Sequence, residues 1–300
     1  MLAIIIPYYK LAFFEATLQS LVAQTCQDFK VYIGDDASPE DPKVLLEQFQ
    51  GKFDFLYHRF ETNLGGISLT QHWERCIELS VNESWLMILG DDDVLGENVV
   101  EAFYKNLEEI KQNGCNVVRF ATQIIDEEGI AISKVFEHPK QEKATDAFWR
   151  KFKGDTRSSL SEYVFSRASF LKYGFKDYPL AWHSDDMAWL EFSMHLPIYS
   201  ISSTPVFVRF SEINISGKTD NQQQKLKATN LFLTSLIVAN TSNFLKCQKQ
   251  ELLLELEVKI KKERKLKIEE WFFLAKNYFI FFQFFSFLKF SKRFISSYLK

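Results

Sequence analysis

The chain has 300 residues, of which 46% are hydrophobic, and a formal net charge of −3 with a pI near 6.0. This length is enough for one large domain, or for a domain of about 200 residues with an appendage. The balanced charge excludes a strongly basic chain of the kind that binds nucleic acid, so no nucleic-acid partner is expected.

The first 125 residues alternate between apolar runs typical of buried strands and segments whose apolar residues recur at helical spacing. Strands are predicted over residues 3–6, 29–33, 53–59, 85–89 and 116–123. Helices are predicted over residues 11–23, 42–49, 67–79 and 97–112. This alternation predicts an α/β domain with a Rossmann-like, mostly parallel sheet flanked by helices.

Beyond residue 125 the alternation breaks down. Residues 126–160 carry little signal and are expected to form a polar connection. The pattern then predicts helices over 166–173 and 185–195 and strands within 198–210, followed by helices over 226–244 and 252–270. Because the composition changes near residue 216, we expect a catalytic domain over residues 1–215 and a helical C-terminal region over residues 216–300.

Cysteine use and the N-terminus both indicate the cytoplasm. The four cysteines lie far apart without metal-ligand spacing, and we interpret them as reduced thiols. The first residues are apolar but too few for a signal peptide, and they lack a basic start. A cytoplasmic protein is therefore expected.

The most informative stretch is the apolar run over residues 85–89, which leads through Gly90 into three consecutive carboxylates, Asp91, Asp92 and Asp93. In open α/β sheets, ligands bind at the carboxyl ends of the strands. Adjacent carboxylates repel one another unless a cation lies among them, and Mg²⁺ or Mn²⁺ suits oxygen ligands of this kind. A solvated acidic turn is the alternative, but the buried strand before the acids favours a metal site.

Five segments resemble motifs of family 2 glycosyltransferases with the GT-A fold, in the family's order and spacing. They are Ile-Ile-Ile-Pro-Tyr-Tyr-Lys at 4–10, Leu-Gln-Ser-Leu-Val-Ala-Gln-Thr at 18–25, Ile-Gly-Asp-Asp-Ala-Ser at 33–38, Asn-Leu-Gly at 63–65, and Leu-Gly-Asp-Asp-Asp-Val-Leu at 89–95. The similarity covers residues 1–125 well, 160–215 loosely and the C-terminal region not at all. In the last motif, Gly90 stands where the family usually has the first acid of D-x-D.

The resemblance implies an inverting transfer of one sugar from a nucleoside-diphosphate sugar, expected to be UDP-linked, to a hydroxyl. The acceptor would be a glycan or a lipid-linked molecule in cell-surface polysaccharide synthesis. Tyr9 would stack on the base, and Asp36 would accept from the base imide or a ribose hydroxyl. The residues expected to bind the donor are Pro7, Tyr9, Asp36, Asn63 and Asp91. Asp92 and Asp93 are expected to hold the metal, with Asp92 the better ligand by position.

The resemblance also implies a carboxylate base at the start of a late helix. The candidates are Asp185 and Asp186, and alignment of the residues that follow places Asp185 at the base position. A carboxylate there accepts the proton of the acceptor hydroxyl. Aspartate is also favoured at helix N-termini for capping, so one of the two acids is expected to cap the helix.

The C-terminal tail is rich in phenylalanine, with ten between Phe272 and Phe294. Residues 271–290 have the length of a bilayer span but contain Lys276 and Lys289, and a lysine at the bilayer centre costs on the order of 3 kcal/mol. This favours a helix lying in the interface of an anionic membrane, at the inner face of the cell membrane. Packing against the protein or against a second copy in a homo-oligomer is the alternative.

Two other functional classes are the alternatives. A nucleotidyltransferase that makes nucleotide sugars would need a glycine-rich loop after the first strand, and residues 7–11 contain no glycine. A non-catalytic, membrane-associated binding protein on the same fold would not need carboxylates both at 91–93 and at 185–186. The sequence therefore favours the glycosyltransferase.

Overall fold

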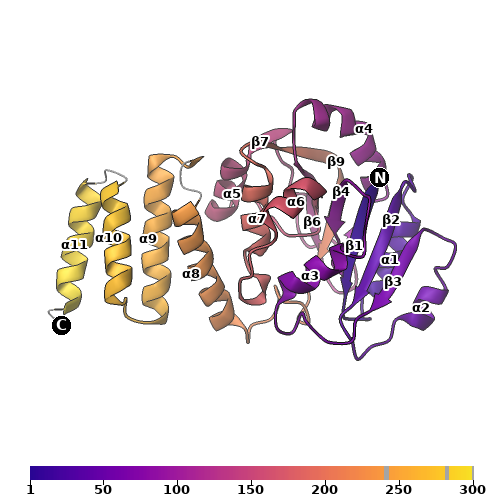
Figure 1. Cartoon of the computed structure of the whole chain (residues 1–300), viewed down its shortest axis with the longest axis horizontal. Helices are drawn as coiled ribbons and strands as arrows, with labels where there is room; N and C mark the ends of the chain where they lie inside the picture. Colours follow the sequence, from indigo (N-terminus) through magenta and orange to yellow (C-terminus); the bar gives the residue numbers. More distant parts are fainter. Residues whose placement is uncertain (240–242, 281–283, 299–300) are drawn as a thin grey trace. The chain divides into compact units, whose positions relative to one another are not determined.

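The computed structural model describes residues 1–239, 243–280 and 284–298. The chain forms two compact units, Met1–Asn221 and Gln222–Lys300 (Figure 1). The first unit holds the sheet and the second is helical in its described part.

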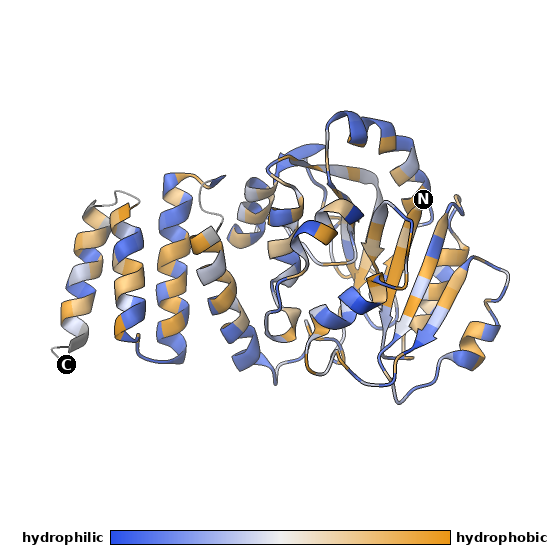
Figure 2. Cartoon of the chain, in the orientation of Figure 1, coloured by the Kyte–Doolittle hydropathy of each residue, from blue (hydrophilic) through white to orange (hydrophobic). Residues whose placement is uncertain are grey.

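The N-terminal half of the first unit is the predicted parallel sheet. Its strands lie in the order β3-β2-β1-β4, all parallel, with Ile4 of β1 opposite Val31 of β2 and Met87 of β4. The bounds are β1 Leu2–Tyr8, β2 Phe29–Asp35, β3 Phe55–Arg59 and β4 Trp85–Ile88. Residues on both faces of β1 and β4 are buried, which explains why these strands are nearly continuous apolar runs (Figure 2).

The second half of the sheet is mixed. From β4 the order continues as β8-β6-β9-β5, where β8 runs antiparallel to both β4 and β6, and β6 and β9 are parallel. The bounds are β5 Val94–Leu95, β6 Val117–Ile125, β7 Gln141–Lys143, β8 Tyr163–Ser166 and β9 Pro197–Arg209. The fold is thus the expected α/β architecture, with antiparallel strands where the alternation of the sequence breaks down.

Helices cover the sheet and bury its apolar side chains. Phe14 and Leu18 of α1 and Phe103 of α4 belong to one core cluster with the strand residues, and each such buried side chain contributes about 1.5–3 kcal/mol. The bounds are α1 Phe14–Val22, α2 Lys43–Glu47, α3 Leu69–Ile77, α4 Val99–Gln112, α5 Ala144–Lys153, α6 Arg167–Tyr173, the short 3₁₀ helix Pro179–Ala181 and α7 Ser184–Phe192.

Two predictions in this unit were wrong. The supposed polar connection contains β7 and α5, and α5 packs through Ala144, Ala147 and Phe148 before Gly154 ends it in the left-handed conformation at φ 81°. Charged residues interrupt the apolar residues of α5, and the helical spacing was therefore not recognised. Helix α7 is not amphipathic, because most of its residues are buried, including Trp189 and Phe192.

The second unit consists of helices that follow one another side by side (Figure 1). The bounds are α8 Gln222–Ala239, α9 Lys246–Glu263, α10 Ile268–Ile280 and α11 Phe284–Tyr298. Trp271 packs on Phe290 and Phe294, and Arg293 of α11 makes two hydrogen bonds of 2.6 and 2.7 Å to the buried Glu257 of α9.

The helix predicted over 252–270 is divided, because α9 ends at Glu263 and α10 begins at Ile268. The candidate span over 271–290 is divided too, because α10 ends at Ile280 and α11 begins at Phe284. Residues 281–283 of that span lie outside the described residues. Across the described ranges, none of the helices has the length and apolarity needed to cross a bilayer.

Candidate active site

A cleft of about 790 Å³ opens at the carboxyl ends of β1, β2 and β4. It is also lined by residues of the α5–β8 connection and by the start of α7. The sequence-predicted residues that line it are Pro7, Tyr9, Asp36, Asn63, Asp91, Asp92, Asp93, Asp185 and Asp186. Residues more than 170 positions apart in the chain therefore share one cavity.

Asp91 and Asp93 fix the acidic turn to its surroundings. One carboxylate oxygen of Asp91 accepts from the backbone N–H groups of Tyr9 and Lys10, at 2.7 and 2.8 Å. Asp93 accepts from the backbone N–H of Arg209 at 2.8 Å through one oxygen and from the Ser161 hydroxyl through the other. These bonds join β4 to the exit of β1 and to the end of β9.

Gly90 lets the carboxylates fold back over the turn. A Cβ atom at position 90 would lie 2.9 Å from Asp92 Oδ1 and 3.0 Å from Asp93 Oδ2. An aspartate here, as in the usual family motif, would need these two side chains to move. The lack of a side chain at position 90 thus leaves room for these two carboxylates.

The pKa values of the three carboxyl groups in the acidic turn are all raised. Burial, followed by repulsion from Asp92, raises the pKa of Asp91 to about 7 and that of Asp93 to about 8. Burial also raises the pKa of Asp92, against the opposing effect of Lys10. A cation among these groups would favour their ionised forms.

The donor set fits a divalent ion that shares its ligands with phosphate. In the part of the chain that the structure describes, no three side chains of His, Cys, Asp or Glu are grouped as a metal site. Mg²⁺ and Mn²⁺ sites of this type use one or two carboxylates and take other ligands from substrate phosphates and water. Asp91 and Asp93 each accept from backbone N–H groups, whereas Asp92 lies near Lys10 and Asn214.

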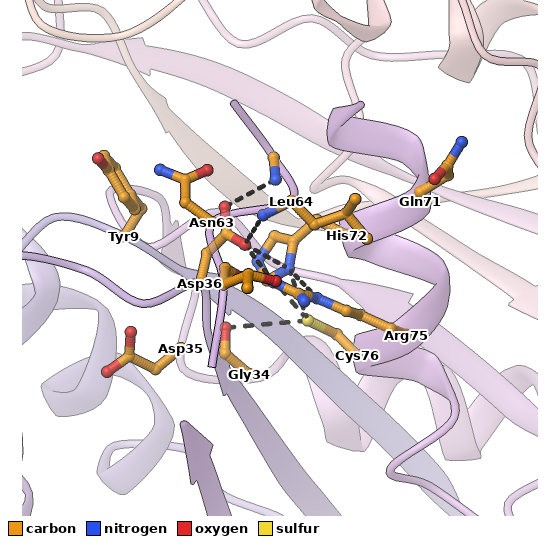
Figure 3. Close-up of polar contacts among 12 residues, drawn as sticks. Tyr9, Gly34, Asp35, Asp36, Asn63, Leu64, Gln71, His72, Arg75 and Cys76 are labelled. Atoms are coloured by element: carbon orange, nitrogen blue, oxygen red, sulfur yellow. Dashed lines mark hydrogen bonds and ion pairs between the residues drawn. The ribbon is translucent and has the colours of Figure 1, made fainter. Parts of the chain in front are cut away.

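Asp36 lies at the centre of a polar network (Figure 3). Its two oxygens accept from the backbone N–H groups of Leu64 and Gly65, each at 2.8 Å. The guanidinium of Arg75 donates to the same carboxylate and lies 3.9 Å from the centre of the Phe60 ring. A Cβ at position 65 would come within 2.5 Å of Asp36, so this contact requires glycine.

This network gives Asp36 a positioning role that the sequence did not reveal. The expected hydrogen bond to the base or ribose would compete with three protein donors already on the carboxylate. The side chain of Asn63 also makes a hydrogen bond within the turn, because its oxygen accepts from the Gly66 N–H at 2.6 Å. Asp36 therefore holds the turn over residues 63–66 at the wall of the cleft.

His72 and Arg75, both on α3, were not predicted as site residues. His72 lines the cleft and its Nδ1 lies 3.4 Å from Asp36, while burial lowers its pKa to about 4, so it is neutral at pH 7. The one available signal was their spacing of three residues, which puts both on the same side of a helix. That spacing is too common to identify a site.

The two acids at the start of α7 have different environments. Asp186 is buried, with Lys151 Nζ at 2.6 Å from one oxygen and His183 Nδ1 at 2.7 Å from the other. Burial alone would raise its pKa, but Lys151 and His183 outweigh that effect and hold the pKa well below its usual range. Asp186 is therefore an ionised partner in a side-chain network, and the expected capping role is not its main contact.

Asp185 is half-buried at the cleft wall. Burial, and then the neighbouring charge of Asp186, raise its pKa to about 6, against the lowering effect of Lys151. A carboxylate with this pKa is mostly ionised at pH 7 and still basic enough to accept a proton. Of the two acids, Asp185 is therefore the one whose pKa lies nearer to neutrality.

The backbone leading into α7 is strained. Leu180, Ala181 and His183 have φ values of 60°, 50° and 72°, in the left-handed region that costs non-glycine residues about 1–3 kcal/mol each. All three line the cleft. Strain concentrated beside Asp185 is typical of a functional segment.

Comparison with known proteins identifies the family of the chain. Residues 3–163 match the family model described as glycosyl transferase family 2. A relative from Haemophilus influenzae, described as an uncharacterized glycosyltransferase, is 37% identical over 114 residues, which make up 38% of this chain. The matched region spans 35% of that relative, or about a third of its length.

Two solved structures share the fold. Residues 1–349 of S. aureus TarS, in complex with UDP-GlcNAc, superpose with a TM-score of 0.64 at 15% identity, covering 94% of this chain and 80% of that one. The mannosyltransferase PcManGT from Pyrobaculum calidifontis, in complex with GDP-Man and Mn²⁺, has a TM-score of 0.56 at 10% identity, covering 96% and 84%. At such low identity the likeness shows the fold alone.

Proposed function

Because the chain belongs to glycosyl transferase family 2, we propose that it moves one sugar from a nucleoside-diphosphate sugar to a hydroxyl group, with inversion at the anomeric carbon. The observation that carries this proposal is that the acidic turn and Asp185 line the same cleft. Direct displacement needs a stabilised leaving group on one side of the reacting carbon and a base for the attacking hydroxyl on the other.

The donor would occupy the part of the cleft formed by the ends of β1, β2 and β4. Tyr9 is 37% exposed and offers a ring for the base, next to Pro7 and the turn that Asp36 holds. UDP and UDP-GlcNAc in the TarS structures and GDP-Man in PcManGT support a nucleotide-sugar donor. We propose a UDP-linked sugar and a glycan or lipid-linked acceptor of cell-surface polysaccharide synthesis.

We propose that Asp92 holds a divalent cation, Mn²⁺ or Mg²⁺. When bound, such an ion neutralises charge on the departing diphosphate. The protein's own contribution is to hold Asp92 in place, through the bonds of Asp91 and Asp93 to neighbouring strands. Mn²⁺ in the PcManGT structure supports the use of a divalent cation.

We propose that Asp185 accepts the proton of the acceptor hydroxyl. Lys151 and His183 keep Asp186 ionised and fix the first turn of α7, which orients Asp185. The strained residues at 180–183 would help to form the acceptor side of the cleft.

Replacing Tyr9 with alanine should weaken nucleoside binding about tenfold to a hundredfold even without metal, because stacking on a base is worth roughly 1–3 kcal/mol. Calorimetric titration with uridine measures this. The control is Phe272→Ala, which removes an exposed ring from the C-terminal unit. Equal uridine affinity in the wild type and the Tyr9 variant would show that Tyr9 only packs.

We also propose that the C-terminal unit contacts the inner face of the cell membrane. Phe272 and Phe279 of α10 and Phe285 of α11 are 69%, 71% and 79% exposed, and residues 271–300 contain five basic and no acidic residues. Exposed aromatic and basic side chains together suit an anionic lipid surface.

The full chain should therefore sediment with vesicles that contain anionic lipid, and bind zwitterionic vesicles much less. Changing Phe272 and Phe279 to serine should abolish sedimentation, whereas Leu171→Ser, at an exposed apolar residue of α6, should not. Failure of the wild-type chain to bind anionic vesicles at low salt, together with concentration-dependent oligomers, would replace this proposal with self-association.

A further inference from the structure

The connection between α5 and β8 lines the cleft with hydroxyl groups and one arginine, Arg157. Ser161 accepts from the Gly90 N–H at 3.0 Å and donates to Asp93, and thereby ties this connection to the acidic turn. Ser159 is held in turn by the buried Glu162, with 2.6 Å between the Ser159 N–H and the carboxylate. The connection is therefore fixed at the end nearest β8.

Arg157 is incompletely paired. Its Nη1 atom is buried and has no hydrogen-bond partner among the described residues. A buried donor of a charged group left without a partner is costly and needs an explanation. In this cleft, the natural explanation is a bound ligand that supplies a hydrogen-bond acceptor to Arg157.

Three of the four other lysines and arginines that line the cleft have identified protein partners, and the fourth, Lys218, is not free either. Lys151 pairs with Asp186, Lys10 donates to the Ile213 carbonyl, and Arg209 donates to the carbonyls of Asp92, Asp126 and Glu127. Arg157 differs from these three in having a guanidinium nitrogen without a hydrogen-bond partner among the described residues. Arg157 lines the same cleft as the acidic turn.

We infer that Arg157 forms a subsite for a phosphate group of the substrate. The planar guanidinium matches a phosphate with paired N–H donors, and its charge suits a doubly charged group. The phosphate would belong either to the donor diphosphate or to a phosphorylated acceptor. This inference rests on the proposed function, because both sources are substrates of the same cleft.

The test compares binding by wild type, Arg157→Met and Arg157→Lys, with Lys105→Met as a control that removes one positive charge from the exposed side of α4. The probes are UDP, uridine and inorganic phosphate, each titrated with Mn²⁺. If the phosphate is that of the donor, Arg157→Met should bind UDP about tenfold to a hundredfold more weakly, with uridine unchanged. Arg157→Lys should keep part of the affinity for UDP, because lysine keeps the positive charge but lacks the paired N–H donors of the guanidinium.

If the phosphate is that of the acceptor, UDP affinity should be unchanged, and UDP-saturated Arg157→Met should lose the millimolar phosphate binding of the wild type. In either case Arg157→Met should melt at the same or a higher temperature, since the change removes an unpaired buried group. A structural arginine would instead lower the melting temperature.

Wild-type and Arg157→Met proteins with equal affinities for UDP and phosphate would overturn the inference and leave the proposed function standing. A wild type that binds none of the probes would overturn both.

Discussion

Replacing Asp185 with asparagine should slow sugar transfer at least a hundredfold while donor affinity stays nearly unchanged. General-base help is typically worth ~10²–10⁴ in rate, and it is needed as the acceptor oxygen attacks the anomeric carbon. Loss of an interaction made in the transition state lowers turnover more than ground-state binding. Release of nucleoside diphosphate, with water in place of the acceptor, measures the rate, and calorimetry measures the donor affinity.

The same residue predicts how the rate depends on pH. The raised pKa of Asp185, about 6, means that the base is protonated at lower pH. The wild-type rate should fall about tenfold per pH unit below about pH 6 and level off above it. Asp185→Asn should lose this acid limb. Lys151→Met should move the limb to higher pH, because Lys151 lowers the pKa of Asp185.

Asp186→Asn is the matched control and should have the opposite signature. It breaks a buried pair with Lys151 and the bond to His183, so the free energy of unfolding should fall by on the order of 3 kcal/mol. This cost exceeds what loss of a helix cap would give, about 1 kcal/mol. If Asp186→Asn is inactive at temperatures where it is folded, and Asp185→Asn is merely less stable, the roles are exchanged.

Asp92→Asn should abolish the effect of Mn²⁺ on nucleotide binding. In the wild type, Mn²⁺ should raise the affinity for UDP at least about tenfold, or 1.4 kcal/mol, because Asp92 would hold a cation that offsets the charge of the diphosphate. The variant should bind UDP equally with and without Mn²⁺ and keep its melting temperature. Relief of repulsion within the acidic turn should offset any lost contact.

Two further variants make this test specific. Asp155→Asn changes an exposed aspartate outside the cleft and should behave as wild type. Asp93→Asn should lower stability, because Asp93 accepts from Arg209 and Ser161. Full Mn²⁺ dependence in Asp92→Asn, and its loss in Asp93→Asn without loss of stability, would transfer the ligand role to Asp93.

The elements that the sequence predicted are those whose signal is local. A buried strand such as β4 is a continuous apolar run, and α4 has apolar residues at helical spacing, so both were found within a few residues of their ends. The acidic residues Asp91, Asp92 and Asp93 directly follow β4 along the chain. Their position at the carboxyl-terminal edge of the sheet follows from the topology of parallel strands.

The side chains that the sequence did not reveal act through partners distant in the chain. Arg75 meets Asp36 across 39 positions, and Lys151 meets Asp186 across 35. Neither lysine nor arginine on a helix is unusual, so nothing local separates them from solvated charges. The missed helix α5 supplies Lys151, and the error in secondary structure therefore concealed a site residue as well.

The most direct test of the central claim is release of nucleoside diphosphate from a panel of nucleotide sugars incubated with the full chain and Mn²⁺. We expect release from at least one donor, no release when the metal is chelated, and at least about a hundredfold slower release by Asp185→Asn that still binds the donor. A wild-type chain that binds a nucleotide sugar with Mn²⁺ and leaves it intact, with a range of glycan and lipid-linked acceptors present, would contradict the proposal and indicate a binding protein on this fold.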